Sequence, residues 1–148
     1  MRVRVTRLAH GAGLPLPVYS SEGAAGADVC AALEDDLVLQ PGARAAVPTG
    51  LCAEIPLGYE MQVRARSGLA LREGLGIVNA PGTIDADYRG EIKIILINHG
   101  ADAVRIRRGD RIAQLVLAPV VRAAFEECAE LAASERGEGG FGSTGVRG

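Results

Sequence analysis

Short apolar runs broken by proline and glycine are the feature that most restricts how this chain can fold. Residues 91–97 read Glu-Ile-Lys-Ile-Ile-Leu-Ile, a β-branched run typical of a strand that enters a core. We expect similar strands at residues 2–8, 37–39, 43–47, 51–55, 59–64, 104–106 and 112–117, with turn signals such as Pro41-Gly42, Pro48-Thr49-Gly50 and Pro56-Leu57-Gly58 between them. One helical turn is expected at residues 67–73, with Ser67 as its N-cap. Closely spaced short strands predict an all-β fold, a jelly-roll-like barrel or sandwich.

The length and the cysteines limit the class of protein further. A chain of 148 residues has the size of one domain. Its three cysteines, Cys30, Cys52 and Cys128, are odd in number and form no Cys-x-x-Cys pair, which argues against a disulfide framework and a zinc site. No apolar stretch approaches the roughly 18 residues that span a bilayer. We therefore expect a soluble, cytoplasmic protein without a membrane partner.

The charge balance argues against a protein that wraps a long nucleic acid. The net charge is -2, the isoelectric point lies near 5.7, and aromatic residues make up 3% of the chain with no Trp. Nucleic-acid binders carry basic patches, and single-strand binders carry several aromatic stacking platforms. We expect no nucleic-acid partner, although a single nucleotide needs only local positive charge.

Residues 82–90 carry the densest chemistry in the chain. They read Gly-Thr-Ile-Asp-Ala-Asp-Tyr-Arg-Gly and lie between the Pro81-Gly82 turn signal and the strand expected at residues 91–97. This position predicts a hairpin tip or strand edge that can present backbone groups to a flat ligand and a carboxylate to a reacting atom. Taken alone, such a segment is more often a solvated loop than an active site.

The C-terminal end changes character after about residue 126. Residues 126–135 are polar and alanine-rich, and residues 136–145 are glycine-rich with one phenylalanine. Composition alone favours a disordered end, and the phosphate-binding Gly-x-x-x-x-Gly-Lys-Ser/Thr pattern fails because the lysine is missing. We divide the chain into a β domain at residues 1–135 and a mobile glycine-rich tail, or flexible C-terminal arm, at residues 136–148.

Five segments, in sequence order, resemble the five motifs of the trimeric dUTP nucleotidohydrolases, or dUTPases. They are residues 25–31 (Ala-Gly-Ala-Asp-Val-Cys-Ala), residues 66–70 (Arg-Ser-Gly-Leu-Ala), residues 82–90 with Asn79 just before them, residues 108–115 (Arg-Gly-Asp-Arg-Ile-Ala-Gln-Leu), and the tail at residues 136–145. The resemblance covers residues 20–145. Each motif is weak alone, but five in order at suitable spacings are highly specific. The family's β jelly roll agrees with the fold expected from the strand pattern.

The resemblance implies that the protein hydrolyses dUTP to dUMP and pyrophosphate, which keeps uracil out of DNA and supplies dUMP for dTMP synthesis. Asp85 would be the general base that deprotonates the water attacking the α-phosphorus, and an aspartate of ordinary pKa is ionised at pH 7. The implied cofactor is Mg²⁺, held by the triphosphate and by waters. No direct protein ligand is expected for this ion, and Asp28 would anchor it through water.

The resemblance also assigns substrate contacts. Contacts with uracil and deoxyribose fall on Asn79, Gly82, Thr83, Ile84, Tyr88 and Phe141. Tyr88 would pack against the sugar and leave no room for a 2′-hydroxyl, while Phe141 would stack on uracil. Contacts with the phosphates fall on Arg66, Ser67, Gly68 and Gln114, covered by Arg136, Gly142, Ser143 and Thr144 from the tail. The role of Arg111 stays open between a phosphate contact and a packing or salt-bridge role.

The family's assembly implies a homotrimer with three shared sites. Each site would take the first, second and fourth motifs from one chain, the third from another and the tail from the last, and about a dozen extended tail residues can span roughly 40 Å. We expect Asp87 and Arg89 to be solvated or intersubunit groups, and His10 and His99 to be surface loop residues. Two alternatives stay open: a dCTP deaminase, which has a glutamate where this chain has the Asp85 motif, and a non-catalytic nucleotide-binding regulator or trimeric scaffold.

Overall fold

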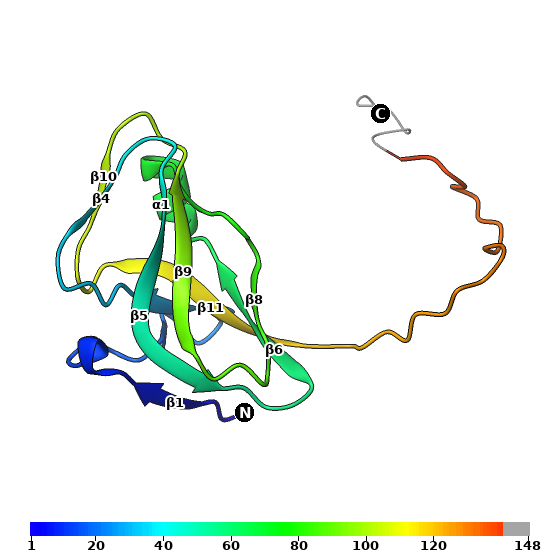
Figure 1. The fold of residues 1–148 in the computed structure, drawn as a ribbon, viewed down its shortest axis with the longest axis horizontal. Helices are drawn as coiled ribbons and strands as arrows, with labels where there is room; N and C mark the ends of the chain where they lie inside the picture. The colour runs from blue at the N-terminus through cyan, green and yellow to red at the C-terminus, as the bar shows by residue number, and fades with distance from the viewer. Residues whose placement is uncertain (141–148) are drawn as a thin grey trace.

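The computed structural model describes residues 1–140 and is built almost entirely of β-strands (Figure 1). The strands are β1 (Arg4–Arg7), β2 (Val18–Tyr19), β3 (Ala27–Cys30), β4 (Leu37–Leu39), β5 (Arg44–Glu54), β6 (Tyr59–Arg64), β7 (Leu75–Ile77), β8 (Gly82–Ile84), β9 (Glu91–Asn98), β10 (Val104–Ile106) and β11 (Arg111–Pro119). Two short helices accompany them, the 3₁₀ turn η1 (Ala9–Gly11) and the α-helix α1 (Ser67–Glu73).

All of the strand pairs are antiparallel, and the strands form three sheets. A four-stranded sheet has the order β1-β5-β9-β7, a five-stranded sheet has the order β2-β3-β11-β6-β8, and β10 pairs with β4. Neighbours such as β3 and β11 are far apart in the sequence, as the long connections of a jelly roll require. The all-β, jelly-roll-like prediction is confirmed.

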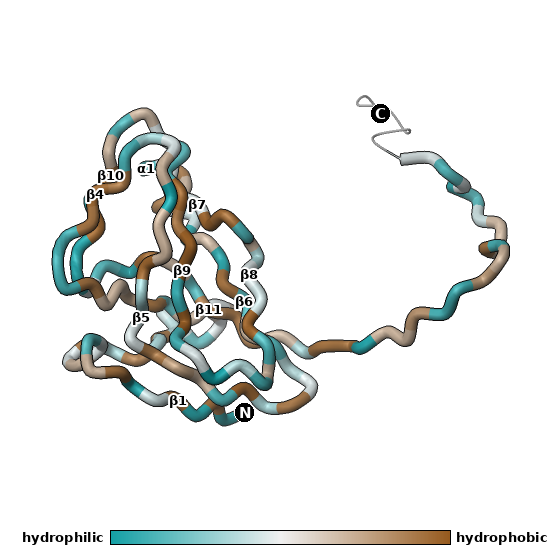
Figure 2. The backbone as a smooth tube through the Cα atoms, viewed as in Figure 1, coloured by the Kyte–Doolittle hydropathy of each residue, from teal (hydrophilic) through white to brown (hydrophobic). Residues whose placement is uncertain are grey.

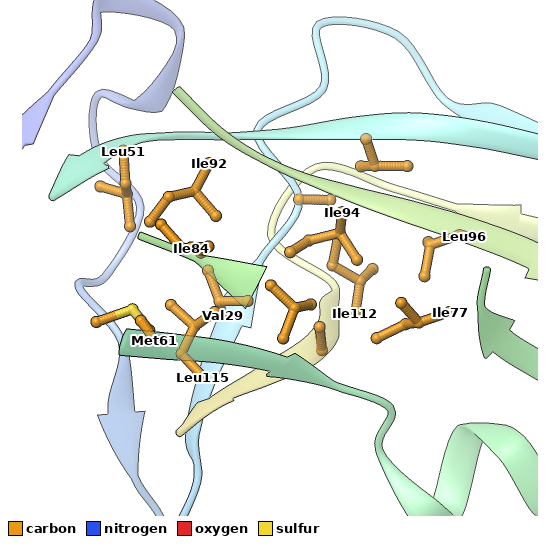
Figure 3. Packing of buried hydrophobic residues seen from close by; sticks show 14 of the residues in the cluster. Val29, Leu51, Met61, Ile77, Ile84, Ile92, Ile94, Leu96, Ile112 and Leu115 are labelled. Atoms are coloured by element: carbon orange, nitrogen blue, oxygen red, sulfur yellow. The ribbon is translucent and has the colours of Figure 1, made fainter. Parts of the chain in front are cut away.

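The core lies between the two larger sheets. In β9 the residues Ile92, Ile94 and Leu96 are buried while the positions between them face outward, as the two-residue period of a strand requires. They meet side chains such as Met61 and Leu115 from the five-stranded sheet (Figure 3). Full burial of one such aliphatic side chain contributes about 1.5–3 kcal/mol. This packing holds β8, β9 and β11 in fixed positions and so supports the surfaces described below.

Two of the expected strands are one strand, which corrects the turn predicted at Pro48-Thr49-Gly50. β5 runs from Arg44 to Glu54, and its pairing with β9 shifts register between Pro48 and Cys52. Gly50 absorbs the irregularity with a positive φ of 67°, a conformation that favours glycine. The turn signal therefore marks a bulge within a strand.

Three strands were not predicted from the sequence, β2, β3 and β7, and β8 falls in the segment that was predicted only as a hairpin tip or strand edge. They contain only two to four residues each. Their pairing partners define them, whereas the three-residue strands β4 and β10 were predicted from their apolar residues. β3 and β8 fall within segments expected to bind substrate, so these strands place parts of the site on the five-stranded sheet.

After β11 the chain leaves the body as an extended arm, visible in orange in Figure 1. Residues 120–140 contain neither helix nor strand. Figure 2 shows apolar stretches along this arm, and Val121, Phe125 and Leu131 are 95%, 99% and 87% exposed. Apolar side chains left this open are normally covered by another surface.

Two further findings concern residues 1–140. No helix in this range combines the length and the apolar character needed to cross a membrane. Cys30, Cys52 and Cys128 are all free, and burial raises the pKa of the Cys30 thiol although the charge of Arg111 opposes the shift.

Candidate active site

One group of expected site residues gathers where β11 lies between β3 and β6. Gln114 of β11 is in register with Asp28 of β3 on one side and with Arg64 of β6 on the other. The chain continues from β6 through Arg66 into α1, so this register brings three sequence-distant segments together. A surface depression opens there, lined by Ser20, Ala24, Ala25, Gly26, Asp28, Arg66, Ser67, Gly68 and Gln114. We call it the Arg66 depression.

An ion-pair cluster forms one wall of the Arg66 depression. Arg66 Nε lies 3.0 Å from Asp28 Oδ1, and Arg111 Nη1 lies 3.0 Å from Asp28 Oδ2. Arg66 Nη1 also donates to the Arg111 carbonyl oxygen at 3.0 Å. One carboxylate thus holds two guanidinium groups, which leaves a net positive charge suited to phosphate oxygens. Arg111 forms the salt bridge that was one of its two expected roles.

Gln114 is held by a hydrogen bond to the backbone and occupies the space left by the missing side chain of Gly26. Its Nε2 donates to the Ala65 carbonyl oxygen at 2.9 Å. A Cβ atom at Gly26 would lie 2.1 Å from Gln114 Oε1, so position 26 has no room for a side chain while Gln114 keeps this position. The glycine of the first motif therefore makes space for the glutamine of the fourth.

The start of α1 differs from the prediction. The N-cap is Arg66, which makes no side-chain capping hydrogen bond, and Ser67 is the first residue of the helix. Ser67 is exposed and Gly68 is partly buried beside it. The prediction of Ser67 as N-cap is wrong, because the extended chain from β6 ends at Arg66, one residue earlier than expected, and Ser67 is already helical.

The second group of expected residues lies on the hairpin between β8 and β9. Asp85 and Tyr88 are both exposed, and the Tyr88 N–H donates to the Asp85 carbonyl oxygen at 3.2 Å. The Tyr88 hydroxyl donates to the Glu91 carbonyl oxygen at 3.0 Å, which folds the ring back over the hairpin. A second depression, the hairpin pocket, is lined by Ala46, Thr83, Ile84, Asp85, Tyr88, Glu91, Ile92, Lys93 and Ile95.

The segment before the hairpin adds an amide to the same strand. Asn79 is exposed, and its Nδ2 lies close to the backbone of Gly82, since a Cβ atom there would be 3.0 Å away. The Ala80–Pro81 peptide bond that connects them is cis. Within residues 1–140, β8 pairs with β6 alone and forms the edge of the five-stranded sheet. An edge strand presents unpaired backbone donors and acceptors on its outer side.

Four further residues were expected at the surface, and they differ in exposure. Asp87 and Arg89 are exposed, and Arg89 Nη1 donates to the Ala86 and Tyr88 carbonyl oxygens. His99 is exposed, as expected for a surface loop residue. His10 is partly buried in η1, and its Nε2 lies 2.6 Å from Glu91 Oε1, which corrects its prediction as a surface loop residue.

Glu91 was not predicted as a site residue from the sequence. Burial alone raises the pKa of its carboxyl group, but the hydrogen bonds from His10 and the Gly50 N–H, with the charges of His10 and Lys93, outweigh burial and lower the pKa below its ordinary value. A signal for Glu91 was present in the sequence: its carboxylate directly follows the Asp-x-Asp-Tyr-Arg-Gly segment and stands at the start of a mostly apolar strand.

The Arg66 depression and the hairpin pocket are far apart within one chain. Met61 pairs with Ile84, so Asp85 lies level with Glu60 at one end of β6, whereas Arg66 follows the other end. At about 3.3 Å per residue, the six positions from Glu60 to Arg66 span about 20 Å. The two depressions have no lining residue in common. One chain therefore does not bring Asp85 to the Arg66 depression.

The expected tail residues are only partly described. Arg136 lies exposed on the arm, and its Nε donates to the Gly139 carbonyl oxygen at 2.7 Å. Phe141, Gly142, Ser143 and Thr144 lie outside the described residues.

The fold and the Arg66 depression define a class: an antiparallel β protein with a surface suited to an anionic ligand. The model of the dUTPase family matches residues 13–145. Deoxyuridine 5′-triphosphate nucleotidohydrolases of Zymomonas mobilis and Anaplasma marginale are 58% and 54% identical to the chain over 146 residues, covering 99% of each chain. The chain belongs to the dUTPase family, and the prediction that it is an enzyme of this family is confirmed.

A solved structure supports the same conclusion at the level of the fold. The dUTPase of Staphylococcus bacteriophage 80alpha, solved with dUpNHpp, superimposes with a TM-score of 0.87 at 29% sequence identity. The match covers 98% of this chain and 99% of the phage chain. The similarity extends over the whole β body and is not confined to one motif.

Proposed function

We propose that the protein hydrolyses dUTP to dUMP and pyrophosphate. Membership of the dUTPase family supports this substrate, and the phage relative was solved with dUpNHpp. The observation that carries the proposal is the exposed Asp85 on the hairpin, whose carboxylate takes part in none of the ion pairs formed within residues 1–140. This carboxylate is available to a water molecule at the surface where a substrate enters.

Asp85 is the general base in the proposed mechanism. An exposed carboxylate is charged at neutral pH and accepts a proton from water. The resulting hydroxide oxygen bonds to the α-phosphorus, the bond from that phosphorus to the bridging oxygen breaks, and pyrophosphate leaves. Positioning by the protein accounts for part of the rate gain, since a water held in line attacks without searching for its orientation.

Charge stabilisation on the phosphates is assigned to the Arg66 depression. Phosphoryl transfer is accelerated chiefly by groups that neutralise the charge on the transferring phosphate. Arg66 and Gln114 supply fixed N–H donors there, and Arg111 from outside the lining helps to hold the Asp28 carboxylate that orients Arg66. Ser67 and Gly68 are assigned to phosphate contacts as well, because they line the same depression.

Selectivity for base and sugar is assigned to the hairpin. β8 is an edge strand, so the outer backbone groups of Gly82, Thr83 and Ile84 are free to pair with the edge of uracil. Asn79 lies beside them and adds a side-chain amide. Tyr88 is held by its hydroxyl group, and its ring face packs against deoxyribose where a 2′-hydroxyl would clash. Phe141 of the tail is assigned to stacking on the base.

Mg²⁺ is the proposed cofactor, and the residues fit it. Residues 1–140 contain no cluster of three His, Cys, Asp or Glu side chains that could cage a metal ion. Mg²⁺ commonly keeps several waters and binds through substrate phosphates with one or two carboxylates. Asp28 accepts one hydrogen bond on each oxygen, which leaves each a lone pair for a metal-bound water. When bound, the ion neutralises charge on the triphosphate.

A homotrimer with shared sites completes the proposal. The base must reach the water within about 2.6–3.2 Å, yet Asp85 and Arg66 lie about 20 Å apart along one chain by the rise of β6. Two copies of the chain resolve this conflict by pairing the hairpin of one with the Arg66 depression of the next. The exposed arm then reaches a third copy, where Arg136, Gly142, Ser143 and Thr144 cover the phosphates.

The proposed cellular role is to keep uracil out of DNA and to supply dUMP for dTMP synthesis in the cytoplasm, with no nucleic-acid or membrane partner. A panel of dUTP, dTTP, dCTP and UTP with detection of pyrophosphate and ammonia tests base, sugar and reaction together. We expect pyrophosphate release from dUTP to exceed that from each of the other three nucleotides by a large factor. Ammonia from dCTP would indicate the deaminase instead, and binding of dUTP without turnover would indicate a non-catalytic regulator.

A further inference from the structure

We propose that Glu91 is a positioning residue for the hairpin: its side chain, bound to Gly50 and His10, fixes the backbone that sets the angle of Tyr88. The inference rests on the proposed function, because it assigns the discrimination between deoxyribose and ribose to a carboxylate that does not touch the substrate.

The contacts of Glu91 are those of a built anchor. It follows Gly90 directly and begins β9. Its Oε1 accepts a hydrogen bond from the Gly50 N–H at 2.9 Å and lies 2.6 Å from His10 Nε2. The side chain is only 13% exposed, although the hairpin tip beside it is open to solvent. A carboxylate with this little exposure is costly unless it is paired and hydrogen-bonded, so these contacts fix its position.

The bulge in β5 explains why a carboxylate is needed at position 91. The ladder between β5 and β9 is interrupted between Pro48 and Cys52, so the Gly50 N–H lacks the usual strand partner. Glu91 supplies the missing acceptor from its side chain. Gly50 is held against η1, because its carbonyl oxygen accepts a hydrogen bond from the Leu8 N–H at 2.8 Å and a Cβ atom at position 50 would lie 2.4 Å from the Cα of Gly11, which leaves no room for a side chain.

The second partner of Glu91 is itself held from behind. Arg108 Nη1 donates to the His10 carbonyl oxygen and Nη2 donates to the Ala12 carbonyl oxygen, both at 2.7 Å. Two other charged groups face this cluster. Lys93 Nζ lies 3.8 Å from Glu91 Oε2, and Glu34 lines the same surface hollow as His10 and Glu91. The anchor therefore connects η1, β5 and β9.

The backbone of Glu91 carries the effect to Tyr88. The Tyr88 hydroxyl donates to the Glu91 carbonyl oxygen at 3.0 Å. Gly90 makes this possible, because a Cβ atom at position 90 would lie 2.4 Å from the Tyr88 hydroxyl oxygen. The side chain of Glu91 fixes residue 91, and the carbonyl group of residue 91 fixes the ring.

The test compares kcat/KM for dUTP with kcat/KM for UTP in the wild type and in Glu91→Ala, Glu91→Gln, His10→Leu and Gly90→Ala. The ratio of the two values does not depend on how much of the enzyme is folded. We expect Glu91→Ala and Gly90→Ala to lower the ratio by about tenfold or more, because misplacement of about 1 Å can cost 10²-fold. Glu91→Gln should lower it less, since its amide oxygen still accepts from the Gly50 N–H.

Glu54→Gln is the matched control. It removes a carboxylate from the same sheet, but one in an exposed pair with Arg4 at 3.0 Å, and its ratio should equal that of the wild type. An unchanged ratio in a folded Glu91→Ala, or an equal fall in Glu54→Gln, would overturn the inference. If Glu91→Ala does not fold, His10→Leu and Gly90→Ala decide, because both keep Glu91. A wild type that releases no pyrophosphate from dUTP would refute the proposed function instead.

Discussion

Mixing two inactive variants tests whether each active site is shared between chains. Asp85→Asn removes the proposed base from the hairpin, and Arg66→Ala removes a phosphate contact from the other half-site. The register of β6 with β8 places Asp85 level with Glu60, six residues before Arg66, which is about 20 Å along the strand. General-base catalysis needs contact within about 3 Å, directly or through one water, so the two residues cannot serve one site in the same chain. Each substitution therefore damages one half-site of its chain and leaves the other half-site intact. Asp28 also keeps Arg111 as a partner when Arg66 is removed.

The assay is pyrophosphate release from dUTP after the two variants are unfolded and refolded together in equal amounts. Random assembly gives trimers that contain both variants. In an equal mixture about half of the hairpins and about half of the Arg66 depressions are intact, so about a quarter of the sites combine two intact halves. Activity should therefore recover to about a quarter of the wild-type value. A mixture of Asp85→Asn with Tyr88→Ala, both on the hairpin, should show no more activity than the mean of the two variants refolded separately. If tagged chains prove that hybrids form and activity still does not return, the shared-site reasoning is refuted.

Three further predictions follow from the same structure. Asp85→Asn should lower turnover by ~10² to 10⁴ while dUTP still binds by calorimetry, because only the base is lost; near-normal turnover would remove Asp85 from the mechanism. Deleting residues 136–148 should leave a folded trimer with little activity, because every residue of the buried core cluster precedes position 116; full activity in the truncated chain would show that the tail is dispensable. Because Glu91 has a lowered pKa in the folded protein, its charge stabilises the fold above the ordinary glutamate pKa of about 4.3, and this gain is lost as the pH falls through the lowered value. In urea unfolding, the difference in unfolding free energy between the wild type and Glu91→Gln should therefore shrink from pH 7 to pH 3, and a constant difference would contradict this assignment.

Local patterns in the sequence were enough to predict much of the fold. The alternation in residues 91–97 and the turns between apolar runs predicted most of the longer strands, because strand periodicity and turn preference act over a few residues. The same patterns failed at Pro48-Thr49-Gly50, where a turn signal lies inside β5. They also failed at β7, whose three residues form a strand because β9 pairs with them.

The sequence by itself determined the family, the order of the five motifs and the residue types of the candidate site, since these are properties of the chain read in order. Only the tertiary structure decided which residues meet. Arg111 and Asp28 are 83 positions apart, and His10 and Glu91 are 81 apart, yet each pair is in contact. The structure likewise placed Asp85 and Arg66 at opposite ends of β6. Strand register and core packing are set jointly by many distant residues, so no local pattern contains these distances.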